Sequence, residues 1–563
     1  MCVYLHPVKK TVSLGSRLLV SKVSHRRKGR CIVDTLARFD QPTDTAVADL
    51  SSRARTWLLI VACLALLLVI ASMVALNTAI PGIATATSAT QAELTWIIDS
   101  YTLALACLLL PAGALGDRYG RRGAMLFGLF VFGLASLAPA LWSDPVHLII
   151  ARGAAGAGAA FIMPATLSLL TAAYPKDQRN KAVGIWAATA GCGAVIGMLG
   201  SGALLHFWPW QSIFWAFAGA GTALFALTLT IASSKEHEPK PLDLVGAVVI
   251  GGAVAVLVFG ILEAPARGWT DSMVLGCIGA GLVLTVAFGV IELRRRHPLL
   301  DVRLFRIPAF ATGAATITMF FLSMFGFMFV VMQHIQLILG YSPIKTAVAL
   351  TPLMGPTLVL SALSFWYLPR FGLRVVLFVG LVLIAAGLVC LTLLEVDSTY
   401  WDLAWPMLIM STGIGLCTAP PTSAIMNTAP DDKQGVASAV NDTTREIGAA
   451  LGIALAGSML ASRYGDSLGP RLADFPAPVR EGATNSLGQA LEVARQLGPA
   501  GVRLADLSRA AFIDAMGPSV LVLGAVVLVA AVLIGLWAPG RDDEQLRIVR
   551  WFRTRGWRGR HRS

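Results

Sequence analysis

The chain has 563 residues, of which 56% are hydrophobic and only 14% are charged, and its net charge is +13. Soluble domains carry about 25% charged residues, so this composition argues against a soluble protein and indicates a polytopic membrane protein. The excess of positive charge does not point to nucleic acid, because the basic residues gather in tails and in short loops between apolar runs.

Residues 1–56 precede the first apolar run and are rich in lysine and arginine. They lack the short basic, apolar and cleavage-site pattern of a signal peptide. We expect a basic cytoplasmic tail without a packed core, with a folded module as the less favoured alternative.

A membrane-spanning helix needs about 20 apolar residues, and fourteen runs of the chain meet this requirement. They are 57–80, 94–114, 124–143, 146–171, 182–206, 211–232, 244–263, 273–292, 310–333, 344–367, 374–394, 402–427, 434–460 and 513–537. The pattern predicts an all-α polytopic protein.

The positions of lysine and arginine predict the orientation. Short loops on one side carry nearly all of them, whereas those on the other side contain only Arg267 and Lys345. Because short cytoplasmic loops are the basic ones, we expect both termini in the cytoplasm of a cell-membrane protein. The C-terminal tail, 538–563, interleaves arginine with aromatic residues, and we expect both basic tails to meet anionic lipids.

The loop at about 462–512 is long and lies on the other side. Leu487, Ala490, Leu491, Ala494 and Leu497 follow helical spacing. This spacing predicts an ordered amphipathic hairpin outside the membrane.

A charged turn lies between the second and third runs, at residues 113–123. It resembles the loop signature GxLxDRxGRR of the major facilitator superfamily. The resemblance implies a cytoplasmic latch in which Asp117 and Arg121 hold the outward-facing state by contacts to neighbouring helix ends. The predicted latch residues are Gly113, Asp117, Arg118, Gly120 and Arg121.

Two further motifs resemble features of this superfamily. Arg152 corresponds to the buried arginine of the fourth helix, with an interfacial arginine as the alternative. Gly193, Gly197 and Gly202 resemble the antiporter signature of the fifth helix, which marks exporters, although these glycines would also simply allow close helix packing. Met198 stands where the signature usually has proline.

The whole span 57–537 resembles the fourteen-helix drug:proton antiporter branch, and most closely its quaternary-ammonium and biguanide exporters. Matching stretches include 96–101, 298–305 and 336–342. The resemblance implies six helices in 57–232, a two-helix insert with flanking cytoplasmic loops in 233–309, and six helices with the hairpin in 310–537. Ser72 and Asn441 depart from the branch, because relatives have acids at these positions.

Acids inside the spans are the candidates for proton coupling. They are Asp99 on the second helix and Asp442 and Glu446 on the thirteenth, where helical spacing also places Arg445 near Asp442. One interpretation is that Arg445 neutralises Asp442 and leaves Glu446 to titrate. The alternative is an internally paired cluster that stabilises the helix.

Aromatic and sulfur-containing side chains suggest a wall for flat lipophilic cations, which bind aromatic faces. The candidate substrate-binding residues are Asn77, Trp96, Tyr101, Phe325 and Met328. The alternative for each is a contact with lipid or with another helix.

The sequence contains no GxxxxGK[ST], HExxH or GxSxG pattern and no metal-ligand spacing. It therefore predicts no enzyme, no cofactor and no metal. The resemblance implies the proton gradient as energy source, and we favour a monomer. We expect a proton-coupled exporter of lipophilic, cationic compounds. Export of a lipid or hydrophobic metabolite, and a membrane sensor that binds amphiphiles without transport, remain the alternatives.

Overall fold

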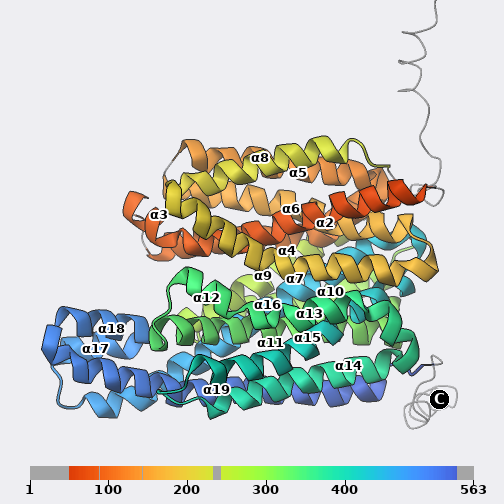
Figure 1. Ribbon diagram of the computed structural model, residues 1–563. Helices are drawn as coiled ribbons and strands as arrows, with labels where there is room; N and C mark the ends of the chain where they lie inside the picture. Colours follow the sequence, from red (N-terminus) through yellow and green to blue (C-terminus); the bar gives the residue numbers. More distant parts are fainter. Residues whose placement is uncertain (1–49, 88, 90, 143, 233–242, 542–563) are drawn as a thin grey trace, which may run out of the picture. The chain divides into compact units, whose positions relative to one another are not determined.

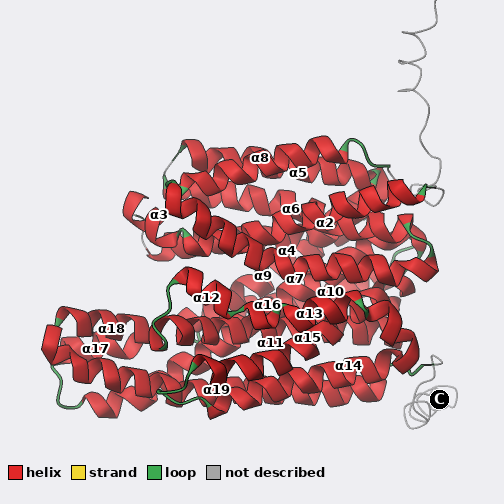
Figure 2. Ribbon diagram, in the orientation of Figure 1, coloured by secondary structure: helices red, strands yellow, loops and turns green. Residues whose placement is uncertain are grey.

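The computed structural model describes residues 50–87, 89, 91–142, 144–232 and 243–541. All regular structure in these ranges is helical (Figure 2). Most of the basic N-terminal tail and nearly all of the C-terminal tail lie outside the described residues, and so does most of the loop before the insert.

The first half of the chain forms six long helices, which correspond to the first six apolar runs. A short 3-10 turn, η2 (Leu76–Thr78), and α3 (Ile80–Thr87) follow the first of them. The long helices pack against one another as a group (Figure 1). They are α2 (Ser52–Ala75), α4 (Gln91–Tyr119), α5 (Arg121–Leu141), α6 (Pro145–Ala173), α7 (Lys176–Phe207) and α8 (Gln211–Thr228).

The insert consists of α9 (Leu244–Arg267) and α10 (Ser272–Arg294). Helix α9 packs against α10 and also against α4 of the first half and α16 of the second. Helix α10 leaves Leu282, Val283 and Val286 more than half exposed, as expected of a helix that faces lipid. The insert therefore touches both halves mainly through α9.

The second half contains five long helices and several short ones. The long ones are α11 (Pro308–Gln333), α14 (Ser364–Cys390), α15 (Tyr400–Thr428), α16 (Gln434–Leu468) and α19 (Val502–Trp537). Within the described ranges, thirteen helices are long and apolar enough to cross a membrane. This agrees with the polytopic all-α prediction.

The tenth apolar run, 344–367, forms no single helix. After the π-helical turn η4 (His334–Ile338), it contains α12 (Pro343–Ala349), η5 (Thr351–Leu353), α13 (Gly355–Ala362) and the start of α14. Pro352 and Pro356 lack the backbone N–H that a continuous helix needs. Gly372, at φ 75°, then interrupts α14. The expected continuous helix is thus wrong here, and the tenth segment is broken.

The hairpin before the last helix is ordered and helical, as its spacing predicts. It contains η8 (Gly469–Leu472), α17 (Ala477–Asn485), α18 (Leu487–Gln496) and η9 (Gly498–Gly501). Leu487, Ala490 and Ala494 are buried, whereas Leu497 is exposed. On the exposed face of α18, hydrogen bonds from Arg495 and Gln496 lower the pKa of Glu492 to about 2.

The two halves meet along α4 and α16, α6 and α16, and α7 with α13 and α15. One buried apolar cluster comprises the first half, the insert and the adjoining ends of α15 and α16, including Met426, Val436 and Val440. A second cluster fills the rest of the second half. The end where α4 meets the start of α16 is therefore closed by continuous packing.

Candidate functional site

Asp117, near the end of α4, caps the first turn of α16. Its two carboxylate oxygens accept hydrogen bonds from the backbone N–H groups of Gly435 (2.8 Å) and Val436 (3.0 Å). The first N–H groups of a helix have no partner within the helix, and a helix N-terminus favours negative charge. A side chain of the first half thus completes a helix of the second half.

Two glycines allow this contact. A Cβ atom at Gly113 would lie 2.5 Å from the carbonyl oxygen of Gly435, so the α4–α16 crossing has no room for a side chain. Gly120 has φ 112°, a conformation that favours glycine, and it separates α4 from α5. These positions explain the glycines of the charged turn.

Arginines extend the contact to the turn before α16. Arg121 pairs with Asp117 at 2.9 Å and donates to the carbonyl oxygen of Asp431 at 3.2 Å. Arg179, on α7, donates to Oδ1 of Asp431 at 3.0 Å. We call Asp117, Arg121, Arg179 and residues 431–436 the latch, and the end of the molecule that carries it the latch end. Arg118 lies over the ring of Tyr119.

Arg152 of α6 is 2% exposed and binds neutral acceptors. Its guanidinium donates to the Ile97 carbonyl (3.2 Å), to Ser72 Oγ (3.1 Å) and to the Ser72 carbonyl (3.4 Å). It also lies 4.2 Å from the ring centre of Tyr101, whose hydroxyl donates to the Val69 carbonyl. Arg152 is thus buried among helices α2, α4 and α6, and no ion pair of Arg152 occurs among the described residues.

The acids of α16 form a buried cluster with Arg445. Asp442 is 0% and Glu446 5% exposed. Arg445 Nε lies 3.9 Å from Asp442 Oδ1, and Asn441 donates to the same oxygen at 3.0 Å. Within the described residues, Asp442 Oδ2, Glu446 Oε2 and Arg445 Nε have no hydrogen-bond partner. The structure thus brings three predicted residues together and leaves part of their hydrogen-bonding capacity unused.

Aromatic rings enclose Arg445. Its guanidinium lies 4.8 Å from the ring centre of Trp186 on α7 and 5.3 Å from that of Phe321 on α11. Phe321 in turn stacks on Phe325, at 6.0 Å between ring centres. Arg445 also donates a hydrogen bond to Thr422 Oγ1 at 3.4 Å. The cluster therefore joins helices from both halves.

The residues around Arg152 and those around Arg445 lie near each other. Helices α6 and α16 are in contact, and Glu446 lies within electrostatic reach of Tyr101, the residue stacked on Arg152. Each half thus contributes a buried arginine, and the acids beside them among the described residues, Asp442 and Glu446, lie on α16. We call Arg152, Tyr101, Asp442, Arg445 and Glu446 the central cluster.

Asp99 lies apart from the Arg152 contacts. It interacts electrostatically with Glu263 of α9, and Trp96, one turn earlier, stacks on Phe259 of the same helix at 5.8 Å. Asp99 and Trp96 therefore share the face of α4 that is directed toward the insert, whereas Tyr101 packs toward α6.

The predicted substrate-binding residues also lie in different parts of the protein. Tyr101 is fully buried beneath Arg152, Phe325 belongs to the aromatic group around Arg445, and Met328 packs against the core of the second half. Asn77 lies in η2, but its side chain is outside what the structure describes. Among the predicted substrate-binding residues whose side chains the structure describes, Tyr101 thus belongs to the central cluster and Phe325 lies beside it.

The glycines of α7 fit against α2. A Cβ atom at Gly193 would lie 2.9 Å from Ile70, and one at Gly197 would lie 2.7 Å from the Cα atom of Ala71. Gly202 lies further along the same helix, which runs unbroken from Lys176 to Phe207. With Met198 in place of proline, the helix keeps its backbone hydrogen bonds through this region.

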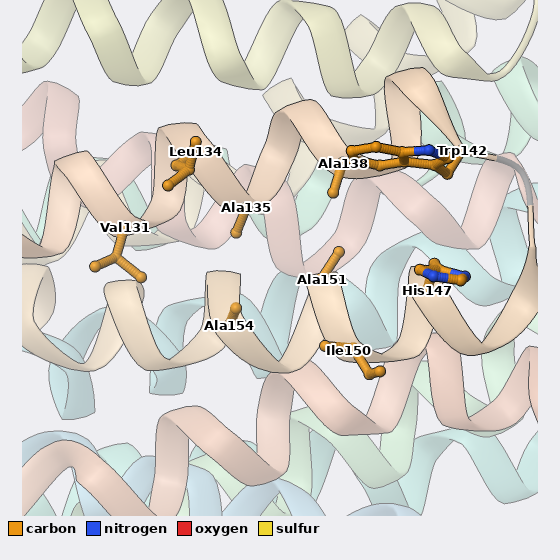
Figure 3. Close-up of a pocket in the computed structure, with 9 residues that line it drawn as sticks. All are labelled: Val131, Leu134, Ala135, Ala138, Trp142, His147, Ile150, Ala151 and Ala154. Carbon is orange, nitrogen blue, oxygen red and sulfur yellow. The ribbon is translucent and has the colours of Figure 1, made fainter.

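An apolar groove of about 330 Å³ lies between α5 and α6, away from the central cluster (Figure 3). Leu134, Trp142 and Ile150 on its walls are more than half exposed. Ala151 lines the groove, whereas the adjacent Arg152 reaches α2 and α4 instead. The groove faces outward and takes no part in the contacts described above. Its lining residues are Val131, Leu134, Ala135, Ala138, Trp142, His147, Ile150, Ala151 and Ala154.

Four residues of these contacts were not among the predicted site residues: Arg179, Trp186, Phe321 and Thr422. Arg179 is one of many basic residues at the ends of the spans, and its partner Asp431 is 252 positions away. Trp186 is one of many aromatic residues within the spans. Local sequence offers no signal for such long-range pairs.

Comparison with known proteins identifies the class. The sequence profile of the Major Facilitator Superfamily matches residues 62–453, and the chain belongs to this family of membrane transporters. It is accordingly a multi-pass membrane protein and a transporter, not an enzyme.

Several relatives are exporters or resistance proteins. The chain is 31% identical over 524 residues to the tetracenomycin C resistance and export protein of Streptomyces glaucescens, covering 90% of this chain and 96% of the relative. It is 32% identical to the multidrug resistance protein Stp of Mycobacterium tuberculosis, and the match covers 76% of this chain and 80% of the relative. It is 31% identical to the methyl viologen resistance protein SmvA of Salmonella typhimurium, and the match covers 86% of this chain and 98% of the relative.

Solved structures share the fold. The human organic anion transporter MFSD10 matches with a TM-score of 0.54 at 13% identity, covering 85% of this chain and 99% of that one. The proton:xylose symporter XylE matches with a TM-score of 0.55 at 14% identity, and the match covers 88% of this chain and 98% of the symporter.

Proposed function

We propose that this chain is a proton-coupled multidrug exporter that moves lipophilic, cationic compounds out of the cell. Its similarity to several export and resistance proteins, each at about 31% identity, supports drug efflux. The observation that carries the coupling proposal is the buried acid pair on α16, with carboxylate oxygens that lack hydrogen-bond partners.

An incompletely bonded, buried carboxylate is unfavourable in its ionised form. Glu446 therefore gains stability from a proton or from a cation, and the two compete for it. Arg445 partly neutralises Asp442 across 3.9 Å, which leaves Glu446 as the principal exchangeable group. Asp99, beside the insert, is the second candidate on the proton route.

The aromatic group around Arg445 supplies faces for a lipophilic cation. Trp186 and Phe321 now lie against the guanidinium, and a flat organic cation would bind the same faces. Cation binding would thus compete with Arg445 and alter its pairing with Asp442. This links substrate occupancy to the protonation of α16.

The closed latch defines the conformation in which coupling would occur. Transporters of this kind rock two bundles around a central site. If the latch end is cytoplasmic, as the basic short loops predict, the structure corresponds to an outward-facing or occluded state with both termini in the cytoplasm. Proton loss to the cytoplasm would then follow when the latch opens.

Reconstituted transport tests the proposal. In proteoliposomes with an imposed pH gradient, ethidium should move against its gradient as protons move the opposite way. Glu446→Gln should abolish the dependence of ethidium flux on the pH gradient, and Asp442→Asn should weaken it. If both variants, and Asp99→Asn, keep wild-type flux with wild-type pH dependence, proton coupling through these acids is wrong.

Export of a neutral lipid or hydrophobic metabolite is the second candidate. The contact between Arg152 and the uncharged Ser72 favours it, because the first half contributes no acid at that point to bind a cation. Flux of a neutral fluorescent lipid, with no flux of ethidium, would support this candidate. Saturable ligand binding without gradient-dependent flux of either compound would instead support a sensor.

The basic tails complete the proposal. Residues 1–56 and 538–563 would bind anionic lipids at the cytoplasmic surface, and the transporter would act as a monomer. Loss of ethidium transport on replacing anionic lipids with zwitterionic ones would be expected only for chains that keep these tails.

A further inference from the structure

The turn between α15 and α16, residues 430–434, is contacted from two directions. From the first half, Arg121 and Arg179 bind Asp431, and Asp117 caps the amides that follow the turn. From the insert, the loop after α10 meets the same turn. The second contact is not part of the latch signature.

The 430–434 turn is a firmly connected unit. Gln434 is fully buried, and its side-chain amide donates to the carbonyl oxygens of Met426 (3.1 Å), Ala429 (3.1 Å) and Pro430 (3.2 Å). These bonds tie the end of α15 to the start of α16. A displacement of the 430–434 turn on one side would therefore also move the Gly435 and Val436 amides that Asp117 binds.

Lys433 makes the contact with the insert. Its ammonium group donates to the carbonyl oxygen of Pro298 at 2.5 Å, 135 positions away in the sequence. A hydrogen bond from a charged donor is stronger than one between neutral groups. Lys433 thus ties the 430–434 turn to the loop that leaves α10.

Glu292 determines the shape of that loop. It is 3% exposed, lies near the end of α10, and accepts hydrogen bonds from the backbone N–H groups of Leu299 and Leu300. This curls the loop back and presents Pro298 to Lys433. Lys433 also lies within electrostatic reach of Glu292.

Asp243 of the insert also acts electrostatically on Glu292. Asp243 caps Gly246 at the start of α9 and pairs with Arg295 at 3.3 Å. At the opposite end of α9, Trp269 donates to Ser458 Oγ of α16 at 2.7 Å. The insert is therefore connected to the turn before α16 through the loop after α10, and to α16 itself through Trp269 in the loop between α9 and α10.

We propose that Lys433 and Glu292 are positioning residues through which the two-helix insert holds the 430–434 turn where Asp117 and Arg121 reach it. The insert is then a third component of the latch, beside the two bundles. Neither side chain belongs to the central cluster. Lys433 and Glu292 therefore affect the movement of the two bundles and do not contact the substrate.

Hydrogen exchange of the full-length protein in lipid nanodiscs tests this without any substrate. In Lys433→Met, the peptide that contains the Gly435 and Val436 amides should exchange roughly tenfold faster, because an opening that breaks the Asp117 bonds becomes more frequent. Lys433→Arg keeps a charged donor and should restore slow exchange. Lys181→Met removes an exposed lysine from α7 near the same end and should leave this peptide unchanged.

Glu292→Gln provides the second variant. It should speed exchange at Leu299 and Leu300 and, through Lys433, at Gly435 and Val436. In transport, Lys433→Met should lower the maximal rate with little change in KM, and Lys433→Arg should recover it. The proposal would be overturned if exchange at Gly435 and Val436 were unchanged in Lys433→Met. It would also be overturned if Lys181→Met had an equal effect. Because the exchange measurement needs no drug, this result would not depend on which substrate the protein transports.

Discussion

At the scale of single residues, the contact between Ser72 and Arg152 is the least expected feature. The resemblance to the drug:proton antiporter branch implies an acid at the serine position, yet here a guanidinium that is 2% exposed lies on neutral oxygens and on the ring of Tyr101. A buried charge without an ionic partner depends on each of its hydrogen bonds. Ser72 is therefore part of what makes the buried arginine tolerable.

Replacing Ser72 by alanine tests this dependence. The variant removes one acceptor from a buried charged donor, and we expect a loss of about 1–2 kcal/mol in the free energy of unfolding. Unfolding in mixed detergent micelles measures it. Ser136→Ala is the control, because the hydroxyl of that buried serine donates, within the described residues, to the Phe132 carbonyl of its own helix, and its loss should have a smaller effect.

Asp117 provides a second prediction at this scale. Asp117→Asn keeps one oxygen for the α16 amides but removes the charge that binds Arg121 and the helix N-terminus. We expect the rate of flux to fall by about tenfold while ligand affinity stays nearly unchanged, a loss of about 1.4 kcal/mol. Flux and equilibrium binding measured on the same preparation separate the two effects.

The exposed Asp177, in the first turn of α7, gives the matched control. Asp177→Asn should leave flux unchanged. A parallel loss of affinity and flux in Asp117→Asn would show that Asp117 shapes the binding site itself and would remove the latch interpretation.

At the scale of elements, the crossing of α4 and α16 brings the two halves together. Gly113 and Gly435 approach so closely that neither has room for a Cβ atom, and the Asp117 cap lies one helical turn further along α4. Glycines at such crossings allow backbones to approach. Close packing and electrostatics therefore act on the same pair of helices.

Gly113→Ala should separate these helices. The added methyl group would lie 2.5 Å from the Gly435 carbonyl, and relief of this overlap would lengthen the Asp117 bonds. We expect a destabilisation of about 1–3 kcal/mol and faster hydrogen exchange at Gly435 and Val436. Gly123→Ala, in α5, has open space around the new methyl group and should be neutral or slightly stabilising.

At the scale of the whole molecule, the long helices form two groups with an insert whose α9 touches both. The resemblance implies the six-plus-two-plus-six order, and thirteen of the fourteen apolar runs form helices long enough to cross a membrane. Arg121, Arg179 and Lys433 lie at the latch end, and the hairpin with α17 and α18 lies at the other end (Figure 1).

This arrangement predicts the topology in cells. We expect epitope tags on both termini to be accessible only after the membrane is permeabilised, because short basic loops stay in the cytoplasm. A cysteine at the exposed Glu481 of α17 should react with a membrane-impermeant maleimide in intact cells. Labelling at Glu481 only after permeabilisation would reverse the orientation and place the closed latch on the outside.

The sequence by itself determined the class of fold, the positions of most spans and the helical hairpin. These depend on local properties, namely the length of an apolar run, the spacing of its side chains and the chemistry of its turns. It also identified Asp117, Arg152, Asp442, Arg445 and Glu446, because charged residues in or beside spans are rare enough to stand out.

Only the tertiary structure decided how these residues are paired. Asp117 caps amides 318 and 319 positions away, Arg152 binds Ser72 instead of an acid, and Asp99 faces the insert instead of the central cluster. The segmented tenth run likewise follows from prolines that hydropathy does not register. Apolar periodicity reports which residues leave water, whereas a partner across a helix interface depends on how helices far apart in the chain cross.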